Sequence, residues 1–151
     1  MSDRHGLFAL AAMALITVSP APALAADHGK DMFVAVCEAC HGEGGVGTEG
    51  VAPPLVDPAL WSRLGDKAPT YIAGVLAGGL SGKISANGID YIGLVMPPQT
   101  EAGSLEELTA VANYVLKDLN GLGSFAHTAT IDAALKAPQA HKQLRAMREG
   151  H

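Results

Sequence analysis

Residues 37–41 read Cys37-Glu38-Ala39-Cys40-His41, and this stretch decides which fold we expect of the chain. The two cysteines are the only ones among 151 residues. The segment Asp27–His41 is predicted to be a helix, because its apolar and motif residues recur at helical spacing from Phe33 onward. Positions i, i+3 and i+4 share one helix face. The two thiols and the imidazole are therefore expected to point in one direction.

A C-x-x-C pair followed directly by histidine is the pattern that attaches haem to a chain. Each thiol can add across one vinyl group of haem, and His41 then lies under the iron as an axial ligand. Since the sequence holds no second C-x-x-C-H, it predicts one covalent haem c, bound through Cys37 and Cys40.

The cysteine pair has three other possible uses. A structural zinc site needs four ligands, and His28, His127, His141 and His151 are scattered along the chain. A thioredoxin-like pair needs alternating strands and helices, which the sequence does not indicate. The third use is a plain disulfide in an exported helical interaction protein, which predicts a colourless product.

The N-terminus resembles an export signal over residues 1–25. The apolar run Leu7–Val18 is about a dozen residues long, short of the roughly 20 that span a bilayer as a helix. Ala23-Leu24-Ala25 then offers the small-x-small pattern of a cleavage site. We expect a mature chain from about Ala26, without a transmembrane segment, in the bacterial periplasm.

Charge is distributed unevenly along the chain, whose net charge is −5. Residues 27–122 hold twelve acidic and five basic side chains, whereas residues 123–151 hold two acidic and four basic ones. An acidic body argues against nucleic acid as a partner, because phosphate binding needs clustered Lys and Arg. It suits a redox protein that meets a basic docking face, although the charge could equally serve solubility.

The remaining chain predicts an all-α fold of about three core helices, with long Gly- and Pro-rich loops between them. So much irregular chain in one domain suggests that a large apolar cofactor fills the centre. The expected segments after the first helix are a loop at Val46–Lys67, a helix from Pro69 to Leu76 or Ala77, an irregular stretch at Leu80–Thr100, a helix capped by Ser104 and Glu107 and closed by Gly121, and two short helices at Thr130–Ala137 and Pro138–Arg148.

The second axial ligand is predicted to be Met96. Met32 lies on the cysteine helix and cannot reach the opposite haem face, and Met147 lies in the tail. Met96 precedes Pro97-Pro98 in a loop that the prolines stiffen. A thioether favours Fe(II), so His/Met ligation raises the reduction potential and suits electron transfer.

At this point the chain resembles the class I c-type cytochromes over roughly Asp27–Gly121, through the attachment motif and Met96-Pro97. Pro53-Pro54-Leu55 looks like the Pro-x-Leu segment of that family, which implies that the Pro53 carbonyl accepts a hydrogen bond from His41 and that Leu55 packs on the haem. The resemblance also implies that Gly29 and Phe33 cross the last helix at Val111 and Tyr114. It covers a cytochrome c domain at residues 26–122. The extension at residues 123–151 has no counterpart in the minimal family form.

The function expected from these observations is a periplasmic carrier of single electrons that is not itself an enzyme. Its partners would be a dehydrogenase as donor and an oxidase or another cytochrome as acceptor. The basic tail raises the second possibility of a cytochrome subunit bound to a periplasmic dehydrogenase. The rival from another class is a haem enzyme or gas sensor with an open sixth position, in which Met96 would not be a ligand. Trp61 is expected either to donate to a haem propionate or simply to pack in the core.

Overall fold

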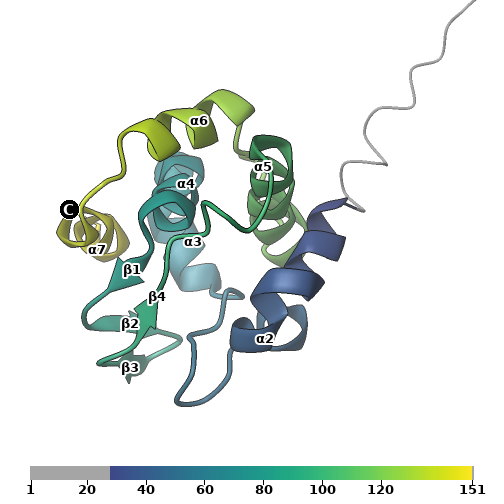
Figure 1. Cartoon of the computed structure of the whole chain (residues 1–151). Coiled ribbons are helices and arrows are strands. Elements are labelled where there is room, and N and C mark those ends of the chain that lie inside the picture. Colours follow the sequence, from purple (N-terminus) through teal and green to yellow (C-terminus); the bar gives the residue numbers. More distant parts are fainter. Residues whose placement is uncertain (1–27, 151) are drawn as a thin grey trace, which may run out of the picture.

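The computed structural model describes residues 28–150, and most of its elements are helices (Figure 1). The expected signal at residues 1–25 lies outside the described part. Among residues 28–150, no helix has both the length and the apolarity of a membrane span. Because helices form most of the described structure, the predicted all-α fold is confirmed. Its labelled helices are α2 (Glu38–His41), α3 (Pro58–Leu64), α4 (Ala68–Gly78), α5 (Leu105–Asn113), α6 (Thr128–Lys136) and α7 (His141–Glu149).

The first helix covers residues 28–41 and crosses α5 at close range. It is α-helical to Met32, widens into a π-helical turn at Phe33–Cys37 and ends as α2. A side chain at Gly29 would collide with the carbonyl of Ala110 and lie 3.1 Å from Cβ of Tyr114. Phe33 stacks on Tyr114 with a centroid distance of 5.3 Å. The predicted crossing at Tyr114 is thus present, with Ala110 rather than Val111 closest to the glycine.

Helix α3 corrects the prediction that the whole segment Val46–Lys67 is a loop. Asp57 caps this helix, since its carboxylate accepts a hydrogen bond from the Leu60 amide at 3.0 Å. Pro58 occupies the first helical position, where its missing N–H costs nothing. Proline opposes the interior of a helix, but directly after a capping aspartate it begins one. The helix places Leu60 and Trp61 in the core.

Helices α4 and α5 follow the prediction closely. Pro69 lies in the first turn of α4, and Gly79 ends it. The capping box of α5 is formed by Ser104 and Glu107, whose side chains each accept from the other residue's amide, at 3.2 and 2.7 Å. Beyond α5 the chain continues as a π-helical turn at Tyr114–Leu119.

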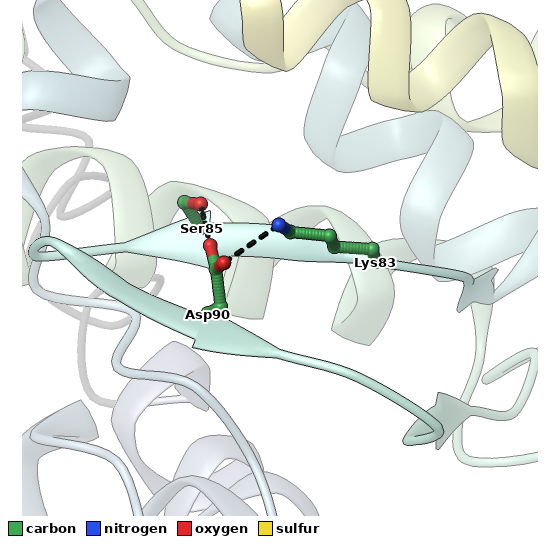
Figure 2. A network of polar contacts seen from close by, with 3 residues as sticks. All are labelled: Lys83, Ser85 and Asp90. Carbon is green, nitrogen blue, oxygen red and sulfur yellow. Dashed lines mark hydrogen bonds and ion pairs between the residues drawn. The ribbon is translucent and has the colours of Figure 1, made fainter.

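Four short strands replace part of the irregular stretch that was predicted between α4 and α5. They form two antiparallel pairs: β1 (Leu80–Ser81) with β4 (Val95–Met96), and β2 (Ile84–Ala86) with β3 (Ile89–Tyr91). The β2–β3 turn is Asn87-Gly88, and both residues have positive φ, at 48° and 77°. Asp90 on β3 forms an ion pair with Lys83 at 2.6 Å. It also accepts a hydrogen bond from Ser85, and Figure 2 shows the three side chains together. These two contacts lower the pKa of the Asp90 carboxyl.

The C-terminal extension folds back onto the body. Helix α6 packs on α4 and α5, and α7 packs against α3, α4 and β1 (Figure 1). Ile131 and Leu144 are both fully buried within the same hydrophobic core as the body. The His141 ring also forms two hydrogen bonds with the body, from Nδ1 with Ser81 Oγ at 2.6 Å and from Nε2 with the Gly78 carbonyl at 3.0 Å. The extension therefore belongs to the packed structure of the domain.

Replacing Leu144 with Ala should lower the free energy of unfolding by about 2–5 kcal/mol, because it empties a fully buried site. The control is Lys142→Ala, an exposed position on the same helix, with an expected effect of about 0.5 kcal/mol or less. Denaturant unfolding of the full chain measures both. Equal effects of the two substitutions would contradict a tail that is part of the core.

Candidate functional site

A largely apolar cavity of about 340 Å³ lies between the first helix, α4, α5 and the strands. This volume is within the range of roughly 300–1,000 Å³ that is usual for small-molecule and cofactor sites. The segments that line it are far apart in the sequence. All six residues predicted to bind haem are among its lining residues: Cys37, Cys40, His41, Pro53, Leu55 and Met96.

His41 is held in one orientation at the cavity wall. Its side chain is buried, and Nδ1 donates to the Pro53 carbonyl at 2.8 Å, as the family resemblance implied. A carbonyl only accepts hydrogen bonds, so the proton is on Nδ1, and Nε2 keeps its lone pair for a metal. Burial lowers the pKa of His41, and the bond to Pro53 partly opposes that shift. The imidazole is thus kept neutral, which is the form that binds iron.

The segment that carries Pro53 is fixed by three hydrogen bonds at Leu55. The Leu55 amide donates to the Gly45 carbonyl at 2.8 Å. The Leu55 carbonyl accepts from Trp61 Nε1 at 2.8 Å and from Asn120 Nδ2 at 3.0 Å. Trp61 therefore combines core packing with a backbone hydrogen bond, and that bond occupies the N–H considered for a propionate.

Asn120 is a positioning residue that sequence reasoning missed. Its amide also donates to the Val115 carbonyl at 2.8 Å and accepts from the Asp57 amide at 3.3 Å. It thereby ties the end of the last core helix to the segment that orients His41. Its position just before Gly121, at a helix end, was the available signal, but its partners Leu55 and Asp57 are 65 and 63 residues away.

The two cysteine thiols are free and differ in exposure. Cys37 is half-buried, and burial together with the neighbouring Cys40 raises the pKa of its thiol to about 11. Cys40 is exposed. Within residues 28–150, no group of three or more His, Cys, Asp or Glu side chains is placed to hold a metal ion, which disfavours the zinc alternative. The two small antiparallel strand pairs do not provide a thioredoxin-like scaffold either.

Met96 reaches the cavity from β4, where it pairs with Leu80. The loop after it is fastened to α4 by the Gln99 amide, which donates to the Leu76 carbonyl at 2.7 Å. Gly79, with φ of 71°, lies directly beneath this loop. A Cβ at that position would collide with the Met96 carbonyl and lie 2.9 Å from the Pro98 nitrogen. Only glycine lets the methionine loop approach α4 this closely.

Gly79→Ala should destabilise the protein in two ways. The backbone conformation costs about 1–3 kcal/mol for a non-glycine residue, and the collision with the loop adds about 1–3 kcal/mol. Gly93→Ala is the matched control, since Gly93 has φ of 78° and nothing within 4 Å of the added Cβ. Unfolding of the two variants separates these costs. A Gly79 variant no worse than the Gly93 variant would contradict the close approach.

The donor set fits a haem. One neutral imidazole, one thioether and two thiols surround a single apolar cavity, and they come from two segments about 55 residues apart. Apolar walls suit a porphyrin, and a nitrogen and a sulfur donor suit iron. Met96, the thioether donor, is half-buried and packs on the core.

Comparison with known proteins agrees with this geometry. Residues 24–115 match the family described as "Cytochrome C oxidase, cbb3-type, subunit III". No curated protein matches the chain. The match covers more than half of the sequence and includes the C-x-x-C-H motif, the Pro53–Leu55 segment and Met96. The chain therefore belongs to this family of c-type cytochromes, whose members bind haem c and transfer electrons.

Proposed function

We propose that this cytochrome is a carrier of single electrons with one haem c attached through Cys37 and Cys40. His41 and Met96 are its axial ligands. The observation that carries the proposal is that these four side chains line the same cavity. When bound, haem supplies the one-electron couple between Fe(III) and Fe(II).

The chain's own residues set how readily the electron is accepted. Pro53 fixes the His41 ring and increases its basicity through the hydrogen bond to Nδ1. The soft thioether of Met96 and the apolar walls both disfavour the extra positive charge of Fe(III). The thioether and the apolar walls support a raised reduction potential, as an electron carrier in a respiratory chain needs, whereas the more basic imidazole moderates that rise.

Several residues that line the cavity also reach the protein surface. Val51 and Val95 both line it and are 50% and 68% exposed, and the lining residue Cys40 is exposed as well. We propose that electrons enter and leave here, through brief contact with other redox proteins. A donor dehydrogenase and an acceptor oxidase or cytochrome are the classes that fit a carrier, and this proposed role needs no catalytic residue in the chain itself.

A free periplasmic carrier is favoured over a dehydrogenase subunit. The tail was the reason to consider a subunit, but α6 and α7 bury their apolar side chains against the chain's own core. The signal-like residues 1–25 support export to the periplasm, where haem is attached.

The test is a spectroelectrochemical titration of the full chain produced with bacterial haem-attachment machinery. We expect one reversible one-electron transition and no peroxide-dependent oxidation of added dyes. A preparation without pigment would contradict the cofactor, and rapid peroxidase turnover by undamaged protein would contradict the carrier role.

A further inference from the structure

Arg148 in α7 places a buried cation at the wall of the haem cavity. Its side chain is 8% exposed. The guanidinium donates to the Tyr71 hydroxyl at 2.8 Å and to the Ser85 carbonyl at 2.9 Å, and lies 5.8 Å from the centre of the Tyr71 ring. Arg148 is also one of the residues that line the cavity. A residue of the extension therefore reaches the site described above.

This guanidinium lacks a counter-charge in the part of the chain that the structure describes. The ion pairs there join Lys83 to Asp90 and Lys136 to Asp132, and no carboxylate lies within 4.0 Å of Arg148. Both of its hydrogen-bond partners are neutral groups. A buried charge is costly unless it is paired, and a guanidinium is matched best by a carboxylate. The missing partner is therefore expected to come with the occupant of the cavity.

The cavity lining indicates where an anionic group of that occupant belongs. Arg148 is the one Lys or Arg among the described lining residues, and most others are apolar. Haem carries its two propionates on the side of the ring opposite its vinyl groups. The vinyl side is assigned to Cys37, which directly precedes α2, and to Cys40 within it, and α2 and α7 lie on opposite sides of the molecule (Figure 1). The polar end of a haem is thus directed toward α7.

We propose that Arg148 forms an ion pair with a propionate of the haem, so that the C-terminal extension completes the cofactor pocket. The inference rests on the proposed haem site. It assigns a role to a segment that lies beyond the family match at residues 24–115. Arg148 then serves as a binding residue that neutralises a buried carboxylate, while Tyr71 and Ser85 hold its side chain in place.

The surrounding charges allow a second source for the anion. Arg148 also borders a polar groove of about 420 Å³, where a free oxyanion such as phosphate presents the same chemistry as a propionate. Arg63 donates a hydrogen bond to the Arg148 carbonyl at 2.6 Å. The carboxylate of Asp57 lies close enough to Tyr71 to raise the pKa of the Tyr71 hydroxyl. The charged residues of the groove are Arg63, Lys83, Arg145, Arg148 and Glu149.

The test measures the midpoint potential of the holoprotein as a function of pH. The curve of Arg148→Gln is compared with those of the wild type and of the control Arg145→Gln. Arg145 is on the same helix and borders the groove but not the haem cavity. Loss of a cation beside the haem favours Fe(III), so Arg148→Gln should lower the potential. The freed propionate should also titrate near neutral pH, which makes the potential fall as pH rises. Arg145→Gln should give a smaller shift and a curve parallel to wild type, and Arg148→Lys should restore most of the wild-type curve.

The outcomes separate this proposal from the proposed function. Pigmented Arg148→Gln with the wild-type curve would overturn the ion pair and leave the electron carrier intact, whereas a colourless wild type would overturn both. A wild-type potential that changes with added phosphate would assign the anion to the groove and overturn the propionate pairing. If Arg148→Gln does not fold, Arg148→Met keeps more of the apolar packing. Should both fail, the wild type decides: a flat curve at neutral pH supports the pair, and a redox-linked ionisation there overturns it.

Discussion

Replacing both Cys37 and Cys40 with Ser should release all of the pigment when the purified protein is extracted with acidified acetone. The wild-type chain should keep its pigment under the same treatment. The physical reason is that two thioether bonds survive unfolding, whereas axial bonds from His41 and Met96 do not survive in acid. The other residues that line the cavity, which are mostly apolar, are left in place by the double substitution. Absorbance of the acetone phase and of the precipitate measures the partition of the pigment.

Ala39→Ser is the matched control for this experiment. Ala39 lies between the two cysteines on the same helix and is exposed. The substitution therefore introduces the same hydroxyl group and removes no thiol. The control should retain its pigment like the wild type. Each single cysteine variant should also retain it through the one remaining bond. Complete extraction of pigment from the wild type would contradict covalent attachment.

Features governed by neighbouring residues could be predicted from the sequence. The helix around the C-x-x-C-H motif depends on spacing within one segment, and the capping box of α5 needs only Ser104 and Glu107. Pro53 could be assigned to His41 because a family pattern records that distant contact. Local rules and one family resemblance were therefore enough to predict six residues that line the cavity.

The errors arose where one residue type has two opposite uses. Proline ends a helix in most positions but begins one directly after a capping residue. Pro58 follows the capping residue Asp57, which was the overlooked signal. Asn87-Gly88 is similarly a strong hairpin turn, yet β2 and β3 are too short to show alternation. Both errors concerned the segments between the core helices, and neither changed the expected site.

The contribution of the extension could not be predicted, because it depends on packing between residues far apart in the chain. Arg148 meets Tyr71 and Ser85 across 77 and 63 positions of sequence. In the sequence its charge simply suggested a basic tail on an acidic body. Burial by α3, α4 and β1 converts that surface charge into part of the cavity wall. Tertiary packing, rather than composition, gives the tail its role.

Met96→Ala should convert a cytochrome that does not bind carbon monoxide into one that does. The substitution removes the thioether and leaves the sixth position of the iron open, while His41 remains held by Pro53. The reduced variant should bind carbon monoxide within the mixing time, and the weak long-wavelength methionine–iron band of the ferric protein should disappear. Its midpoint potential should fall, since the ligand that favours Fe(II) is lost.

Met147→Ala separates this effect from the general cost of shortening a methionine. Met147 is also half-buried and packs on the core, but it lies in α7 and does not line the cavity. Its variant should keep the long-wavelength band and remain unreactive toward carbon monoxide. Rapid binding of carbon monoxide by the undamaged wild type would contradict ligation by Met96. It would favour the gas sensor or haem enzyme instead, because carbon monoxide binds rapidly when the sixth coordination position of the iron is already free of methionine.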